Sequence, residues 1–201
     1  MALPILYGSR ESGHAYKVKL ALSFLGIAHE YRDVDLRVPF SERRSDFRRV
    51  SPYGEVPVFV DGDFVLAQSN AILIHLVRQT DRLSGGDLDL VRQWLFWEAN
   101  RIGFSVPNLR HVLVFATDTP SEVVAWLRSR AEHDLARLDS QLADKAFVLG
   151  IECSVVDIAC CAYLFWPEQA NLDLSLWPNV KGWLERIRDL PGWQAPYDLL
   201  R

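Results

Sequence analysis

The sequence predicts an α/β domain over residues 1–80 followed by an all-α domain over residues 87–201. Strand and helix signals alternate through the first eighty residues, and the strand signals end near residue 87. Ser84-Gly85-Gly86 lies between the two regions, and such a stretch is typical of a short flexible link. The chain has 201 residues, of which 49% are hydrophobic and 24% charged, so two small globular domains are feasible.

The first domain contains a predicted strand–helix–strand unit, a short polar helix, and a hairpin followed by a helix. The strands are expected at 4–7, 29–34, 57–60 and 63–67, and the helices at 14–26, 41–49 and 69–79. Gly26 is the stop signal of the first helix, and Asp61-Gly62 is a favoured two-residue hairpin turn. This order indicates a mixed sheet flanked by helices, as in a thioredoxin-like fold.

The second domain has helix signals alone. Residues 88–112 read as helical, with Pro107 expected to kink or end the first part. The stretch Thr119-Pro120-Ser121-Glu122 predicts another helix start, with Thr119 as the cap and Pro120 at the first position. A later helix carries an apolar stripe, which consists of Val180, Trp183, Leu184 and Ile187.

Charge and cysteine content restrict the class of protein. A formal net charge of −4 gives no support to a nucleic acid partner, because phosphate binding needs a basic face. No basic leader precedes the first strand, and the longest apolar stretch, 155–167, is too short to cross a bilayer. The three cysteines cannot form a disulfide framework, which favours a cytoplasmic protein with no membrane partner. The histidines outside the first helix show no metal-ligand spacing, and no metal is expected.

Two helix starts in the first domain have the features of an anion site. Ser12 stands at the start of the first helix, where a serine hydroxyl either caps the helix or donates a hydrogen bond to a bound thiolate. Gln68-Ser69 begins a later helix, whose N–H groups and dipole attract an anion. Pro57 lacks an N–H and opens a strand, so the backbone of Val56 is left to pair with another chain. Together these features indicate a docking surface for an extended peptide that carries a free carboxylate.

The segment from Tyr7 to Leu22 resembles the first strand, catalytic loop and first helix of soluble glutathione transferases of the bacterial, zeta-like and theta-like types. The resemblance runs through the whole chain. It implies that Ser12 is the catalytic residue that stabilises the glutathione thiolate, with Ser9 as a weaker candidate.

The same resemblance assigns the other glutathione contacts. The Val56-Pro57 step is similar to the family's cis-proline, which presents the Val56 N–H and C=O to the cysteinyl part of glutathione. Gln68 and Ser69 match the positions that hold the γ-glutamyl end. His14 has two open interpretations: a contact that binds glutathione or tunes the thiolate by its charge, or a first-turn histidine that faces solvent.

The chain departs from the family pattern at two places. Zeta-type members have Ser-Ser-Cys where this chain has Ser12-Gly13-His14, which weakens the case for the zeta-type isomerase reaction. The absence of cysteine from the first 152 residues counts against a cysteine-dependent thioltransferase. The residue that holds the glycyl carboxylate is not assigned, although Arg43 and Arg44 are candidates.

In the helical domain, Ser154 and Asp157 look like the family's structural capping box: Ser154 caps a helix and Asp157 reaches back to the Ser154 N–H. We therefore expect a structural role for this acidic residue. Trp94 and Trp97 lie on the helix that in this family lines the dimer interface and the acceptor pocket. The residues that are candidates to shape this pocket are Phe104, Val106 and His111.

The resemblance implies a cytoplasmic, homodimeric glutathione S-transferase that conjugates glutathione, its co-substrate, to a small apolar electrophile in detoxification. Two alternatives remain open at this point. One is a binding or assembly module of the same fold without catalysis, and the other is a glutathione-dependent peroxidase or isomerase.

Overall fold

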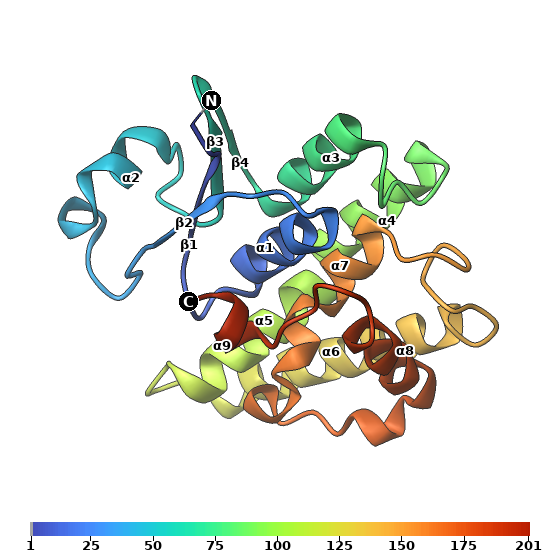
Figure 1. The fold of residues 1–201 in the computed structure, drawn as a ribbon. Coiled ribbons are helices and arrows are strands. Elements are labelled where there is room, and N and C mark those ends of the chain that lie inside the picture. Colours follow the sequence, from blue (N-terminus) through green and yellow to red (C-terminus); the bar gives the residue numbers. More distant parts are fainter. Residues whose placement is uncertain (1) are drawn as a thin grey trace. The chain divides into compact units, whose positions relative to one another are not determined.

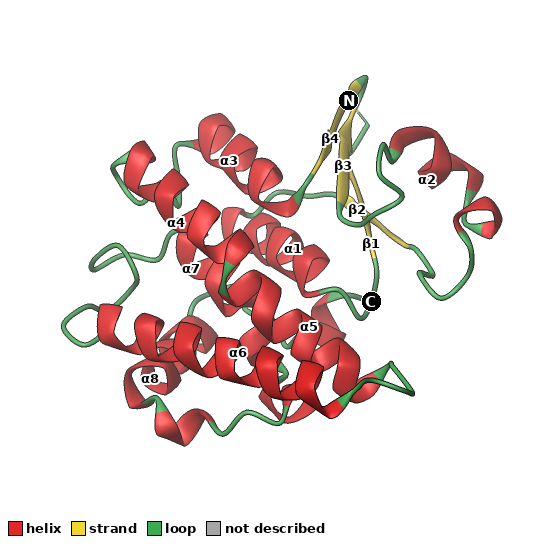
Figure 2. Cartoon of the chain, turned by 180° about the vertical axis from the view of Figure 1, so that it is seen from behind, coloured by secondary structure: helices red, strands yellow, loops and turns green. Residues whose placement is uncertain are grey.

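The computed structural model describes residues 2–201, which form two compact units. The first unit comprises the residues up to Arg82 together with Leu190–Arg201, and the second comprises Leu83–Asp189. All strands of the described residues lie in the first unit, and the second is built from helices (Figure 2). Leu190–Arg201, which the sequence pattern places with the helical domain, belong to the first unit.

The predicted order of elements is confirmed from the first strand to the helix that follows the hairpin. The first unit contains β1 (Ile5–Gly8), α1 (Gly13–Leu25), β2 (Glu30–Asp33), a 3-10 turn (Phe40–Glu42), α2 (Ser45–Val50), β3 (Val58–Asp61), β4 (Phe64–Ala67), α3 (Ser69–Thr80) and α9 (Pro196–Leu199). The second unit contains α4 (Leu88–Asn100), α5 (Ile102–Val114), α6 (Ser121–Gln141), α7 (Val155–Cys161) and α8 (Pro178–Arg188). Three short 3-10 turns connect α7 to α8.

The sheet of the first unit has the strand order β2-β1-β3-β4. β1 runs parallel to β2 and antiparallel to β3, and β3 runs antiparallel to β4. Tyr7 and Val58 are direct partners on adjacent strands, so their side chains lie on the same face of the sheet. They pack there with Val34 and with Phe47 of α2, whereas α1 and α3 pack together on the other face (Figure 1). The mixed sheet flanked by helices is therefore confirmed.

Two turns of the first unit illustrate the use of glycine. Gly26 ends α1 in the left-handed conformation (φ 68°), and its N–H donates to the carbonyls of Leu22 and Ser23. The hairpin loop consists of Gly62 and Asp63, because Asp61 still pairs with Phe64 across the strands. The expected turn at Asp61-Gly62 was therefore placed one residue too early.

The helical unit differs from expectation at two helix boundaries. The break in the predicted 88–112 helix lies at Arg101, and Pro107 is accommodated inside α5. Pro107 is the sixth residue of α5, so its missing N–H removes the hydrogen bond that the Gly103 carbonyl would otherwise accept, and the helix continues past it. Pro120 has extended backbone (ψ 140°) and is the N-cap of α6, so Thr119 is not the cap.

The core of the helical unit follows the predicted pattern. Every residue of α7 is buried, and the predicted stripe of α8 is buried as well. No helix within residues 2–201 is long and apolar enough to cross a membrane.

Candidate active site

The strand register brings three separate sequence segments to one end of the sheet. Tyr7 pairs with Val58, and Val58 pairs with Ala67. The end of β1, the start of β3 and the end of β4 therefore lie side by side. The loop that carries Ser12, the Val56-Pro57 step and the Gln68-Ser69 pair extend from these three strand ends.

Ser12 is the N-cap of α1. Its backbone is extended (φ −93°, ψ 109°), and its Oγ accepts a hydrogen bond from the Ala15 N–H at 3.1 Å. The turn before it closes through the Ser12 N–H, which donates to the Ser9 carbonyl at 2.9 Å. Both serines are buried, each 8% exposed. A hydroxyl has one donor proton and two acceptor lone pairs, so the cap uses an acceptor site and leaves the proton to donate elsewhere.

Ser69 is the first residue of α3 and is buried, whereas Gln68 is the N-cap. The Gln68 side chain makes no capping hydrogen bond to the N–H groups at this helix start. Gln68 has φ +70° and ψ 113°, a conformation that residues other than glycine rarely adopt. Its Nε2 donates to Glu55 Oε2 at 3.3 Å. A non-glycine residue held in such a conformation is typical of functional sites.

The peptide bond between Val56 and Pro57 is cis. Pro57 is buried directly before β3, and Val56 is partly buried against the apolar cluster around Tyr7 and Phe47. The step thus lies at the edge of the site between the end of β1 and Gln68.

The electrostatic potential at this end of the sheet favours an anion. α1 and α3 both begin here, and neither has an acidic residue in its first turn. Lys17 of α1 is 1% exposed, and its Nζ donates to Asn70 Oδ1 in the first turn of α3 at 2.9 Å. Sequence reasoning missed Lys17 and Asn70. The available signal was a lysine in the middle of a helix in which most of the other residues are apolar.

His14 follows Ser12 in the first turn of α1. Burial, together with the cation of Lys17, lowers the pKa of His14 to about 3. A lowered pKa favours the neutral imidazole near pH 7, which argues against tuning of a thiolate by a positive charge on His14. The His14 side chain is partly exposed, so it lies between the two interpretations of a ligand contact and a solvent-facing residue.

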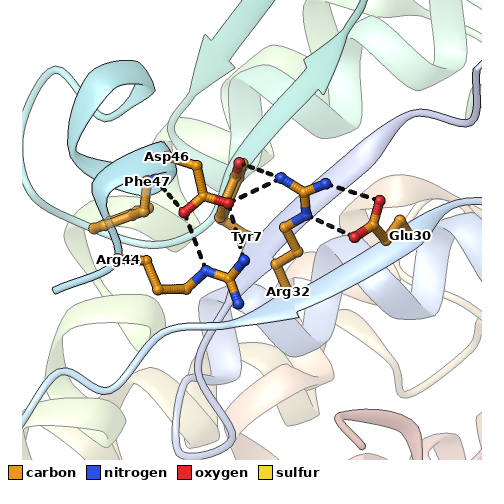
Figure 3. A network of polar contacts seen from close by, with 6 residues as sticks. All are labelled: Tyr7, Glu30, Arg32, Arg44, Asp46 and Phe47. Atoms are coloured by element: carbon orange, nitrogen blue, oxygen red, sulfur yellow. Dashed lines mark hydrogen bonds and ion pairs between the residues drawn. The ribbon is translucent and has the colours of Figure 1, made fainter.

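A network of polar contacts ties α2 to the sheet (Figure 3). Arg32 of β2 donates to Asp46 of α2 (Nη1 to Oδ2, 2.9 Å) and to the Tyr7 hydroxyl (3.0 Å). Arg44 donates to the same carboxylate (Nη2 to Oδ2, 2.9 Å). The hydrogen bond from Arg44 holds the pKa of Asp46 well below its usual range, so the network remains ionised.

Arg43 lies beside this network and binds backbone carbonyls. Its guanidinium donates to the carbonyls of Gly54 (2.6 Å), Val38 (3.1 Å) and Leu36 (3.3 Å). Arg43 and Arg44 therefore both hold the protein's own chain, and the structure does not single out either of them as a ligand for a carboxylate.

The capping box at Ser154 and Asp157 is present at the start of α7. Asp157 accepts from the Ser154 N–H (2.9 Å), the Ser154 hydroxyl (2.8 Å), the Val148 N–H (2.8 Å) and the Trp183 indole N–H (2.9 Å). The carboxylate is fully buried. Four donors thus saturate it, and the bonds from Val148 and Trp183 connect α7 to the preceding loop and to α8.

The aromatic candidates of the helical unit have different environments. Trp94 is buried against Trp97, with ring centroids 5.1 Å apart. Phe104 and His111 are exposed on α5, whereas Val106 is completely buried in the core. Val106 is therefore a packing residue rather than an exposed residue of a pocket.

Comparison with known proteins decides the family. The model described as "Glutathione S-transferase, N-terminal domain" matches residues 4–78, and "Glutathione S-transferase, C-terminal domain" matches residues 106–191. Glutathione S-transferase theta-2 of Rattus norvegicus is 31% identical over 83% of this chain and 73% of the rat protein. The chain belongs to the glutathione S-transferase family.

Two other proteins are similar to the chain over nearly its whole length. The protein "Disulfide-bond oxidoreductase YfcG" of Escherichia coli (strain K12) is 26% identical over 94% of this chain and 91% of the E. coli protein. A crystal structure of a glutathione S-transferase from Pseudomonas fluorescens [Pf-5] superposes with a TM-score of 0.88 at 27% identity, covering 97% of this chain and 99% of that one. The fold is thus shared over nearly the whole chain.

Proposed function

We propose that this glutathione S-transferase family member is a serine-type transferase that conjugates the glutathione thiolate to a small apolar electrophile. The observation that carries the proposal is the convergence of Ser12, the Val56-Pro57 step and Gln68-Ser69 where α1 and α3 begin. Three segments far apart in the sequence meet at one anion-attracting surface, which fits a tripeptide with charged ends and a central thiol.

Ser12 stabilises the thiolate in this mechanism. Its Oγ accepts from the Ala15 N–H, and its proton donates to the glutathione sulfur. A free thiol has a pKa of about 8.5, and lowering this value by ~1.5 units needs about 2 kcal/mol. One hydrogen bond to the anion and the dipole of α1 are of that size. The neutral His14 imidazole lies in the same first turn and is the second candidate to contact glutathione.

The backbone and α3 bind the rest of glutathione. Val56 offers its backbone N–H and C=O to the cysteinyl part, next to the cis Pro57. The N–H groups at the start of α3 and the Ser69 hydroxyl donate hydrogen bonds to the γ-glutamyl carboxylate. Gln68 donates through Nε2 to Glu55, which leaves its Oε1 to accept a hydrogen bond from the ammonium group of the γ-glutamyl end. The Glu55 carboxylate lies close to this amide.

The helical unit supplies the acceptor pocket and the subunit interface in this proposal. Trp94, Trp97, Phe104 and His111 are its candidate residues, and no metal takes part. The protein acts as a cytoplasmic homodimer. The exposed apolar side chains of α4, Leu90 and Phe96, support an interface on that helix.

The test is calorimetry with glutathione on the wild type and Ser12→Ala, together with conjugation of a chlorinated nitroarene on the same samples. We expect micromolar-to-millimolar binding in both proteins and a loss of activity of roughly tenfold or more in Ser12→Ala, because one charge-assisted hydrogen bond is removed. Ser12 is also the cap of α1, so Ser12→Thr, which retains the hydroxyl and the cap, is the control that should keep activity.

Other outcomes would redirect the proposal. Binding without conjugation, combined with turnover of peroxides or of an isomerase substrate, would assign a different glutathione-dependent reaction to the same site. Failure of the wild type to bind glutathione would refute catalysis and leave a binding or assembly module of this fold.

A further inference from the structure

Residues 190–201, which we call the 190–201 strap, run along one face of α1. Three side chains of α1 bind backbone carbonyls of the strap: Tyr16 to Gln194 (2.8 Å), Lys19 to Arg201 (3.1 Å) and Ser23 to Gly192 (2.6 Å). Positions 16, 19 and 23 have the i, i+3, i+7 spacing of one helix face. The strap therefore docks on one face of α1 through three separate contacts within the first unit.

The strap also contacts the loop that leads into Ser12. The hydroxyl of Tyr197 in α9 donates to Glu11 Oε2 at 2.9 Å. The Arg10 guanidinium carbon lies 5.5 Å from the centroid of the Tyr197 ring, within the range of a cation–π contact. Arg10 and Glu11 directly precede Ser12. One aromatic side chain of the strap thus touches both residues before the candidate catalytic hydroxyl.

The loop is held from its other side by β2. The Arg10 N–H donates to Asp33 Oδ1 at 3.2 Å, and Asp33 is the last residue of β2. The loop before Ser12 therefore lies between a contact from the sheet and a contact from α9. Removal of the Tyr197 hydroxyl therefore takes away one of the contacts that hold this loop.

We propose that Tyr197 is a positioning residue of the active site, which fixes the Arg10-Glu11 loop and thereby the direction of the Ser12 hydroxyl. This inference rests on the proposed function, because the Ser12 hydroxyl matters only if it donates to a thiolate. Small displacements of a catalytic donor lower the rate far more than they change the fold, since stabilisation of an anion depends on alignment.

The test compares the pH dependence of conjugation, the ultraviolet absorbance of the bound thiolate, and glutathione binding in Tyr197→Phe and the wild type. Tyr197→Phe keeps the ring and loses only the hydroxyl. We expect kcat/KM at pH 6.5 to fall by roughly fivefold, a change typical of one hydrogen bond. The thiol of bound glutathione should titrate at higher pH, and the Kd of glutathione should stay within about twofold of the wild type.

Two further variants separate positioning from a general effect on the fold. Glu11→Gln retains an acceptor for Tyr197 and should resemble the wild type, whereas Glu11→Ala should resemble Tyr197→Phe, and the double variant should show little additional loss. Ser23→Ala removes a strap contact far from Ser12, so it should lower stability without moving the thiol titration.

The outcomes are distinguishable. An active wild type with unchanged pH profiles in Tyr197→Phe and Glu11→Ala would overturn the positioning role and leave the proposed function intact. Equal shifts of the thiol titration in Ser23→Ala and Tyr197→Phe would assign the effect to the strap as a whole and would also overturn it. A wild type that neither binds nor converts glutathione would overturn both proposals.

Discussion

The hydroxyl of Ser12 has two hydrogen-bonding roles that one side chain can fill together. From the sequence, helix capping and thiolate stabilisation appear as alternatives. In the structure the Oγ accepts from the Ala15 N–H, and a serine hydroxyl still has its proton to donate. The cap fixes the oxygen at the helix start, which is also where the dipole favours an anion. At the residue scale, the two interpretations of Ser12 therefore describe parts of one arrangement.

His14 determines part of the response of the fold to acid. Its folded-state pKa of about 3 lies below the usual value of about 6.5. Between these pH values the unfolded chain binds a proton that the folded chain does not, so the free energy of unfolding falls as the pH decreases from 6.5 toward 3. We predict that His14→Asn lessens this loss by about 1.5 kcal/mol between pH 6.5 and 5. Urea unfolding at both pH values measures it.

The control for this prediction is His133→Asn, which changes an exposed histidine of α6. It should retain the pH dependence of the wild type. An equal acid response in His14→Asn and the wild type would contradict the assigned burial of His14.

The strained backbone of Gln68 gives a substitution that should affect glutathione binding and stability in opposite directions. A non-glycine residue at φ +70° costs of order 1 kcal/mol or more. We predict that Gln68→Gly keeps or raises the melting temperature, because glycine adopts this backbone conformation without strain. It should weaken glutathione binding roughly tenfold, because the hydrogen bond between the side-chain amide and the ligand is lost. Thermal melts and calorimetry measure the two effects.

Asp81→Gly is the matched control for Gln68→Gly. Asp81 ends α3 with φ +53° and lies at the opposite end of the helix from Ser69. Relief of the backbone strain at this position should raise the stability of the protein and leave its affinity for glutathione unchanged. A loss of affinity in Asp81→Gly would refute the local assignment to Gln68.

At the scale of elements, the boundary between α4 and α5 involves a close approach between Glu98 and Gly103. α4 and α5 meet at Arg101, and the buried Glu98 lies against the first turn of α5. A Cβ on Gly103 would stand 2.7 Å from the Glu98 carboxyl carbon and 2.8 Å from the Glu98 backbone oxygen. Local propensity did not reveal this boundary, because it depends on the contact between residues on two different helices.

Two helical glycines make a matched pair of substitutions. We predict that Gly103→Ala destabilises the protein by about 1–3 kcal/mol, since either Glu98 or the start of α5 must shift. Gly182→Ala in α8 should stabilise by up to ~1 kcal/mol, because the nearest atom to its new Cβ is Arg186 Nη1 at 3.5 Å. Denaturant unfolding of both variants tests the pair, and equal effects would contradict the crowding at Gly103.

The capping box connects α7 to its surroundings. Removal of the Asp157 carboxylate would leave donors from Ser154, Val148 and Trp183 buried without an acceptor. We predict that Asp157→Ala lowers the free energy of unfolding by about 3–5 kcal/mol, with a small effect on glutathione affinity in the protein that remains folded. Asp144→Ala, at an exposed position, should change stability by less than about 0.5 kcal/mol. Normal stability with selective loss of binding in Asp157→Ala would argue against a structural role.

At the scale of the whole molecule, two large apolar side chains of α4 are exposed to solvent in the single chain. Phe96 is 75% exposed and Leu90 is 48% exposed. The proposed homodimer would cover these side chains. The α4 helix is therefore the part of the surface on which the oligomeric state should depend.

We predict that sedimentation gives twice the mass of one chain for the wild type and that Phe96→Asp shifts the protein toward the monomer. Leu176→Asp, another exposed apolar position at 68% exposure, should leave the mass unchanged. A monomeric wild type, or equal effects of the two substitutions, would contradict an interface on α4.

Periodicity and turn chemistry in the sequence were sufficient for the order of elements, the buried stripe of α8 and the Gly26 stop of α1, because these features depend on local contacts. The candidate residues Ser12, Val56, Pro57, Gln68 and Ser69 were identified by their chemistry and by family resemblance. Only the tertiary structure placed them at one end of the sheet, because that depends on strand register.

The tertiary structure also decided features that arise between segments far apart in the chain. It placed the Lys17 cation beside Asn70 and the Tyr197 hydroxyl beside Glu11. It also showed that the helix predicted over 88–112 is broken at Arg101. Each of these depends on long-range packing, which burial and close contact fix and which a local pattern does not encode.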